Sequence, residues 1–171
     1  SNSLDGDDIV NFAISGVGPH TISPSSSLPT ISEAILIDAT TQPGTTCGDL
    51  VPASIPAGSN TPHNLMIYLN GLSVTTASGF KVDAQSGEVG VVELRGMAIG
   101  GFTDSNGINA DDVYADDDVN LEVDCMYMGT NVDGMTAVAN ATGIASSIPT
   151  TITNTLLSGN ARGINIFNDS L

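Results

Sequence analysis

The chain has very few basic residues and no tryptophan. Its 171 residues include 19 acids against three bases, which gives a formal net charge of -16 and a pI near 4.1. A protein so poor in Lys and Arg cannot neutralise a row of phosphates, so we expect no nucleic-acid partner. It also lacks the basic patch that adsorbs to anionic membranes, whereas divalent cations and cationic partners are favoured.

Residues that favour long helices are scarce as well, since the chain contains one Lys and four Glu. Glycine is abundant, with 19 residues, and Asn, Asp, Thr and Ser surround short runs of Val, Ile and Leu. This composition is typical of short strands joined by tight turns and predicts an all-β protein. The longest uncharged stretch, 134–161, is polar and contains Pro149, so we expect no membrane insertion.

Three segments repeat at a constant offset of 29 residues: 92–100, 121–129 and 150–158. Each has two alternating apolar positions, a two-residue polar corner and two more alternating positions, which is typical of a strand, a bend and a second strand. Parallel stacking of the repeats predicts two internal rows of side chains. One row would hold Leu94, Val123 and Ile152, and the other Ile99, Met128 and Leu157.

A second repeated element is a glycine followed by a short alternating run, which begins at Gly79, Gly107, Gly143 and Gly163. Each repeat therefore holds about three short strands, which must stack on a neighbouring repeat to bury their apolar faces. This predicts a solenoid. The uneven spacing of the glycines predicts side loops of different lengths, of which the longest, 129–142, should project from the side.

We expect one folded domain over residues 8–171, after a flexible lead-in at 1–7. Within the domain, 8–62 should form irregular first coils and a long loop, and 63–171 the regular coils.

Several motifs together resemble the right-handed parallel β-helix repeat regions of large secreted and cell-surface bacterial proteins. They are Leu28-Pro-Thr-Ile-Ser, Ile37-Asp-Ala-Thr-Thr-Gln-Pro-Gly44, Asn60-Thr-Pro-His63, Met128-Gly-Thr-Asn-Val-Asp-Gly134, Ala139-Asn-Ala-Thr-Gly143, Leu157-Ser-Gly-Asn160 and Gly163-Ile. The resemblance covers residues 8–171 and implies a pectin-lyase-like fold, usually within a longer chain that has adhesin-like or other surface modules. It says nothing of activity, because similar coils serve structural, adhesive and enzymatic proteins.

The acidic segment 111–118 departs from that pattern and is the densest chemical feature of the chain. Its five aspartates are Asp111, Asp112, Asp116, Asp117 and Asp118. Calcium takes roughly six to eight oxygen ligands, so a turn that gathers these carboxylates would suit Ca²⁺. The spacing matches no EF-hand loop, and a solvated acidic turn is the alternative.

Cys47 and Cys125 fit no metal-site spacing. They would pair in a secreted protein and remain buried thiols in a cytosolic one. Cys125 lies at the polar corner of its repeat, so a disulfide with Cys47 would pin the long loop to the stack. Arg95 is expected to stack beside Asp124, near Glu93, and an ion pair between coils competes there with a catalytic role.

Aromatic side chains, which stack on sugar rings, make up only 4% of the chain. The candidates are Tyr68, Tyr114 and Tyr127, and we expect Tyr127 on an exposed face. His20 and His63 lie beside prolines and are expected to form hydrogen bonds within loops. Sequons at Asn140 and Asn168 are candidate glycosylation sites in a source that glycosylates secreted proteins, whereas in bacteria such sequons usually have no meaning.

The last strand-like run has no polar cap, and an unpaired strand edge pairs readily with another strand. The expected assembly edge consists of Gly163, Ile164, Asn165, Ile166 and Phe167. It predicts self-association head-to-tail, or contact with further coils of a longer parent chain. These features favour a non-enzymatic extracellular or cell-surface module, such as a stalk, adhesin segment or fibre subunit. The alternatives are a β-helix protein that binds or degrades polysaccharide and a calcium-dependent surface protein.

Overall fold

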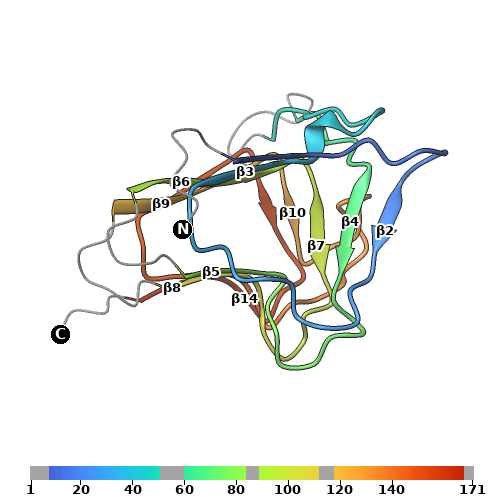
Figure 1. The fold of residues 1–171 in the computed structure, drawn as a ribbon. Helices are drawn as coiled ribbons and strands as arrows, with labels where there is room; N and C mark the ends of the chain where they lie inside the picture. The colour runs from blue at the N-terminus through green and yellow to red at the C-terminus, as the bar shows by residue number, and fades with distance from the viewer. Residues whose placement is uncertain (1–7, 51–59, 84–88, 112–117, 168–171) are drawn as a thin grey trace.

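The computed structural model describes residues 8–50, 60–83, 89–111 and 118–167 (Figure 1). Apart from one short 3₁₀ helix, η1 (Ala39–Thr41), every regular element in these ranges is a β-strand, so the expected all-β class is observed. None of the helical structure in the described ranges is long and apolar enough to cross a membrane. The lead-in expected at 1–7 lies outside the described residues.

The strands form three sheets in which all neighbouring strands run parallel. Sheet A has the order β1 (Asp8–Asn11), β3 (Ile35–Asp38), β6 (Val89–Arg95), β9 (Asp118–Asp124) and β12 (Thr150–Thr153). Sheet B has the order β13 (Leu156–Leu157), β10 (Tyr127–Met128), β7 (Ala98–Gly100), β4 (Ile67–Asn70) and β2 (His20–Ile22). Sheet C has the order β14 (Arg162–Ile166), β11 (Thr142–Ser146), β8 (Asn106–Asp111) and β5 (Phe80–Asp83).

Along the chain, successive strands belong to sheets A, B and C in turn, and we name each such passage a circuit. The first circuit contains β1, β2 and Ile31, which forms a parallel bridge with Val82 of β5. The second contains β3 to β5, the third β6 to β8, the fourth β9 to β11 and the fifth β12 to β14. The three sheets surround a common interior (Figure 1).

Rows of apolar side chains fill this interior, because alternate residues of each strand point inward. The row of sheet A joins Val10, Ile37, Leu94, Val123 and Ile152. The row of sheet B joins Ile22, Leu69, Ile99, Met128 and Leu157. The row of sheet C joins Phe80, Ile108, Ile144 and Ile164. The residues that the offset of 29 placed together are therefore register partners in sheets A and B.

The chain turns from sheet A to sheet B at a corner with left-handed backbone. Gly96, Cys125 and Asn154 occupy this corner in successive circuits, with φ values of 80°, 53° and 42°. Glycine adopts this region without steric cost and Asn tolerates it. At Gly96 an added Cβ would also lie 2.5 Å from the Thr40 nitrogen. This corner is the break in phase that separates the two strands of each repeat.

Glycines at the start of the sheet C strands permit close contact between circuits. A Cβ added to Gly79 would lie 2.5 Å from the carbonyl oxygen of Gly107, and one on Gly107 would lie 2.8 Å from that of Gly143. A Cβ on Gly143 would lie 2.6 Å from the carbonyl oxygen of Gly163. At Gly163 itself no atom of the described residues lies within 4 Å of the added atom. The first three positions exclude a side chain, and the fourth does not.

Candidate functional site

A second, smaller apolar cluster lies on the outer face of sheet B. It is made by Leu65, Tyr68, Ala98, Cys125 and Tyr127, with Leu50, Val132, Val138 and Leu156 packed against it. Tyr127 is only 2% exposed, so the expectation of an exposed ring is wrong. The alternation does point Tyr127 out of the interior, but the chain around Leu50 and Leu65 covers it. The 129–142 loop also packs here through its valines, and its Met135 is 85% exposed.

The chain around Leu50 and Leu65, which we name the covering loop, is fixed to sheet B by contacts between His63 and Tyr127. The Tyr127 hydroxyl accepts a hydrogen bond from the His63 main-chain nitrogen at 2.7 Å, and the two rings stack with centroids 5.1 Å apart. His63 Nδ1 accepts from the Gly48 nitrogen at 2.9 Å, and Nε2 donates to the Asn154 carbonyl oxygen at 2.7 Å. Burial raises the pKa of Tyr127. His63 is thus a hydrogen-bonding loop residue, and both of its ring nitrogens have partners.

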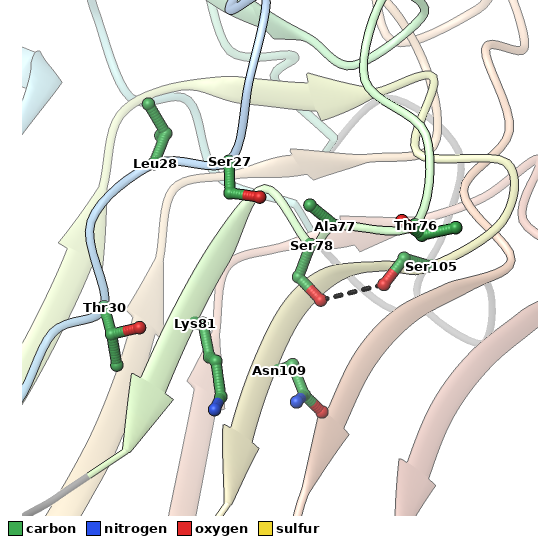
Figure 2. A pocket seen from close by; sticks show the side chains of 9 residues that line it. All are labelled: Ser27, Leu28, Thr30, Thr76, Ala77, Ser78, Lys81, Ser105 and Asn109. Atoms are coloured by element: carbon green, nitrogen blue, oxygen red, sulfur yellow. Dashed lines mark hydrogen bonds between the residues drawn. The ribbon is translucent and has the colours of Figure 1, made fainter.

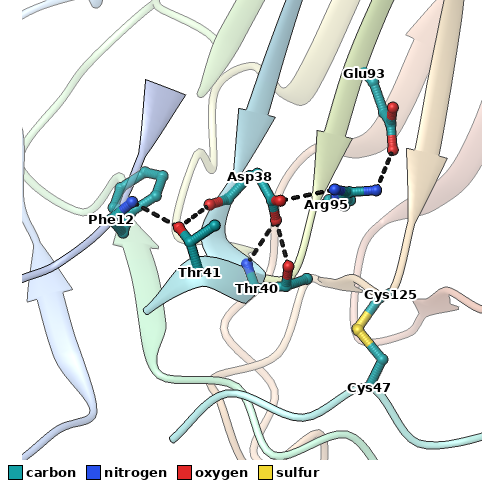
Figure 3. Close-up of polar contacts among 8 residues, drawn as sticks. All are labelled: Phe12, Asp38, Thr40, Thr41, Cys47, Glu93, Arg95 and Cys125. Carbon is teal, nitrogen blue, oxygen red and sulfur yellow. Dashed lines mark hydrogen bonds and ion pairs between the residues drawn. A yellow bond between two sulfur atoms is a disulfide. The ribbon is translucent and has the colours of Figure 1, made fainter. Parts of the chain in front are cut away.

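The same loop is attached at two successive corners. Cys47 forms a disulfide with Cys125, with a Cα–Cα distance of 5.7 Å and a sequence separation of 78 residues (Figure 3). One circuit further, Asn154 Oδ1 accepts from the Leu50 nitrogen and Asn154 Nδ2 donates to the Gly48 carbonyl oxygen, each at 2.8 Å. The covering loop is therefore held by a disulfide at Cys125 and by hydrogen bonds at Asn154, which occupies the equivalent corner 29 residues later.

Arg95 is held by carboxylates on the outer face of sheet A (Figure 3). Its Nη2 lies 2.7 Å from Asp38 Oδ2, and its Nη1 lies 3.1 Å from Glu93 Oε1. Asp124 is the register partner of Arg95 in the next circuit, as expected, but the ion pair joins Arg95 to the preceding circuit instead. Asp124 accepts a hydrogen bond from Thr153 Oγ1 at 2.7 Å. Two bound carboxylates compensate the guanidinium charge, which suits a link between circuits.

Asp38 is almost fully buried, and it caps η1 by accepting hydrogen bonds from the nitrogen and hydroxyl of Thr40. Burial alone would raise the pKa of Asp38, but the hydrogen bonds from Arg95 and Thr40 outweigh it and hold that pKa below its ordinary value. Thr41 Oγ1 donates to the Asp38 carbonyl oxygen at 2.6 Å and accepts from the Phe12 nitrogen at 2.8 Å. This cluster links the first three circuits.

The sequon at Asn140 does not form an accessible glycosylation site in the folded chain. Asn140 is 1% exposed, and its Nδ2 donates to the Ile99 carbonyl oxygen at 3.2 Å and to Asn160 Oδ1 at 3.0 Å. Its Oδ1 accepts from the Phe102 nitrogen at 3.1 Å. Glycosylation at Asn140 stays a prediction, which the burial and hydrogen bonding of this amide in the folded chain disfavour. Asn168 lies outside the described residues.

The calcium ligands expected in the acidic segment fall mostly beyond what the structure describes. Asp112, Asp116 and Asp117 are outside the described residues, and Asp111 and Asp118 are described only as strand ends. Among the side chains that the structure describes, no group of three or more His, Cys, Asp or Glu is placed to hold a metal ion. The Ca²⁺ site stays a prediction, and a Ca²⁺-dependent rise in melting temperature tests it.

Among the described residues, the fifth circuit supplies one edge strand to each sheet: β12, β13 and β14. Every residue of β14 is exposed, including Ile164 at 48% and Ile166 at 58%. The register partner of Ile164 in the fourth circuit, Ile144, is fully buried. The expected assembly edge, Gly163 to Ile166 with the half-buried Phe167 after it, therefore lies on an edge strand with apolar side chains in solvent.

A polar pocket of about 330 Å³ lies on the outer face of sheet C (Figure 2). Five hydroxyl side chains line it: Ser27, Thr30, Thr76, Ser78 and Ser105. Lys81 and Asn109, register partners on β5 and β8, complete its polar lining. Its residues come from separate segments without a shared local motif, and for that reason sequence reasoning missed them.

The chain matches no family model, no curated protein and no solved structure. None of these residues therefore takes a role from a relative.

Proposed function

We propose that this chain is a right-handed parallel β-helix module with a structural role outside the cell, and that it extends head-to-tail from its fifth circuit. The solenoid is supported by three parallel sheets that the chain visits in turn. The proposed right-handedness rests on the general rule that about 98% of parallel crossover connections are right-handed. The same proposal includes the pectin-lyase-like fold that the sequence resemblance implies. The Cys47–Cys125 disulfide supports an oxidising, extracellular location.

Gly163 is the observation that carries the proposed assembly. In the second, third and fourth circuits the equivalent glycine is required, because the carbonyl oxygen of the next circuit leaves no room for a Cβ. At Gly163 no atom of the described residues lies within 4 Å of an added Cβ, so those residues place no such requirement on this position. A further circuit stacked on the fifth would restore that requirement, and it would also cover the exposed Ile164 and Ile166.

The occupant that we propose is the first circuit of a second copy. The inner row of sheet A begins at Val10, which is 41% exposed, and ends at Ile152. The two edge strands of this sheet, β1 and β12, each contain four residues. Pairing of β12 with β1 of the next copy would continue the row from Ile152 to Val10. Such a contact is heterologous, so it produces filaments unless the rotation closes a ring.

The test is sedimentation velocity with negative-stain microscopy across a wide concentration range. We expect concentration-dependent linear oligomers for the unaltered chain. Gly163→Ala and Ile164→Lys should shift the chain to monomers with unchanged monomer melting temperature, because neither position is packed. Met135→Lys, at an exposed apolar residue away from the edges, is the matched control and should still assemble. Monomers at every concentration, or assembly insensitive to both edge variants, would refute the proposal.

A further inference from the structure

The pocket on sheet C has firmly held walls. The Ile31 nitrogen donates to the Lys81 carbonyl oxygen at 2.8 Å, and the Asp83 nitrogen donates to the Ile31 carbonyl oxygen at 2.9 Å, so the first-circuit segment is fixed beside β5. On the other side, Ser78 Oγ and Ser105 Oγ are 3.0 Å apart and share a hydrogen bond (Figure 2). The volume of about 330 Å³ lies at the lower end of the range of small-molecule sites, roughly 300–1,000 Å³.

The lining of the pocket is suited to a ligand rich in hydroxyl groups. Each serine or threonine hydroxyl donates one hydrogen bond and accepts others, and the Asn109 carboxamide does both. A sugar ring presents the same mixture of donors and acceptors on its rim. Leu28 and Ala77 also line the pocket, and both pack against the interior between the sheets. Asn106 Nδ2 donates to Asn109 Oδ1 at 3.1 Å and orients that amide.

The charge at the pocket favours a neutral ligand over an anionic one. Lys81 Nζ lies 2.8 Å from Asp83 Oδ2, so its charge is compensated within the site. The chain as a whole carries a net charge of -16, which repels polyanions such as uronic-acid polymers.

We propose that this pocket is a binding site for a neutral saccharide. The pocket lies on the outer face of sheet C, whereas the proposed assembly pairs strand edges of the fifth circuit with those of the first circuit, whose residues 27–30 form one wall of the pocket. Because the two regions adjoin, binding is also measured on the Gly163→Ala chain, and saccharide binding by its monomers would show that one proposal holds without the other.

The test is titration of the ¹⁵N-labelled chain with cellohexaose, xylohexaose and maltohexaose, with hexagalacturonate as the acidic comparison. We expect at least one neutral oligosaccharide to give saturable amide shifts confined to residues 27–30, 76–81 and 105–109. Hexagalacturonate should bind more weakly. No shift with any of the neutral oligosaccharides, or tighter binding of hexagalacturonate, would overturn the proposal.

A matched pair of variants locates the binding. Asn109→Ala should weaken it about tenfold, because a polar partner is lost. Asn120→Ala is the control: Asn120 is exposed on β9 of sheet A, away from the strand edges, and does not line the pocket. The double variant Ser27→Ala, Thr30→Ala tests the opposite wall, and melting temperatures verify folding. Equal binding by the Asn109 variant, the double variant and the control would contradict a site in this pocket.

Discussion

The hydroxyl of Tyr127 accepts a hydrogen bond from the main-chain nitrogen of His63 at 2.7 Å and donates one to the carbonyl oxygen of the same residue at 3.2 Å. One side chain thereby satisfies both polar backbone groups of a buried residue. An unsatisfied buried group costs about 1–3 kcal/mol, so this contact ties the covering loop to sheet B energetically as well as sterically.

Removal of that hydroxyl should be costly, whereas removal of a second buried tyrosine hydroxyl should not. Tyr127→Phe leaves both backbone groups of His63 without a partner and should lower the free energy of unfolding by about 1–3 kcal/mol. The Tyr68 hydroxyl is buried and has no hydrogen-bond partner among the described residues. Tyr68→Phe should therefore leave stability unchanged or raise it. Urea denaturation measures both variants, and equal losses would contradict this difference.

Loss of the disulfide should destabilise the chain strongly. It closes a loop of 78 residues, and the chain-entropy model gives about 4 kcal/mol for a loop of this size. We expect the double variant Cys47→Ala, Cys125→Ala to lose up to this amount in denaturant unfolding. Asn154→Gly is the comparison, since glycine tolerates the left-handed backbone and the change removes the side-chain hydrogen bonds to the same loop, which should cost about 1–2 kcal/mol. A disulfide variant no less stable than Asn154→Gly would contradict the anchoring role.

The Asp38–Arg95 ion pair should contribute stability that depends on pH. Because the pKa of Asp38 is lowered in the folded chain, its contribution is complete above the unfolded pKa, about 3.9, and is lost as pH falls through the folded pKa. Asp38→Asn should cost about 1–2 kcal/mol at neutral pH, a figure that allows for the partial exposure of Arg95. The difference between the two chains should shrink in acid. Glu93→Gln, at the longer contact, should cost less.

The hydrogen bonds that Asp133 accepts should keep the 129–142 loop ordered down to low pH. Hydrogen bonds from the nitrogens of Thr136 and Met135, at 2.8 and 2.7 Å, lower the pKa of Asp133 to about 2. Its contribution is therefore complete above about pH 4 and is lost as pH falls through about 2. An NMR titration of the Asp133 carboxyl carbon should give this midpoint, and Asp133→Ala should speed amide exchange at Met135 and Thr136. An ordinary midpoint near 4 would contradict the hydrogen bonding.

The parts of the fold that follow a fixed period were predictable from the sequence. The offset of 29 places Leu94, Val123 and Ile152 in one row because strands of one sheet repeat at the same interval. The partner of Arg95 was not predictable in this way, because Asp38 lies 57 residues away, across a circuit that contains a long loop. Tyr127 was assigned to the correct side of its strand, but no local pattern shows that a distant loop covers it.

Asn140 and the pocket show two further limits of sequence patterns. A sequon is a local match and carries no information on burial, whereas the burial of Asn140 depends on Asn160 in the next circuit. The pocket hydroxyls belong to residues that are common throughout this chain, so their convergence depends on the tertiary fold.

At the left-handed corner, the contacts with outer segments of the chain differ from circuit to circuit while the interior rows stay the same. The corner holds Gly96, Cys125 and Asn154 in turn. Gly96 leaves room for the chain at Thr40, Cys125 forms the disulfide, and Asn154 forms a pair of hydrogen bonds. Because the inward rows on either side keep their spacing in all three cases, the way in which a surface loop is attached does not depend on the packing of the interior. A loop with its own anchoring residues could be grafted from one corner to the next, and the aliphatic interior would not have to be redesigned.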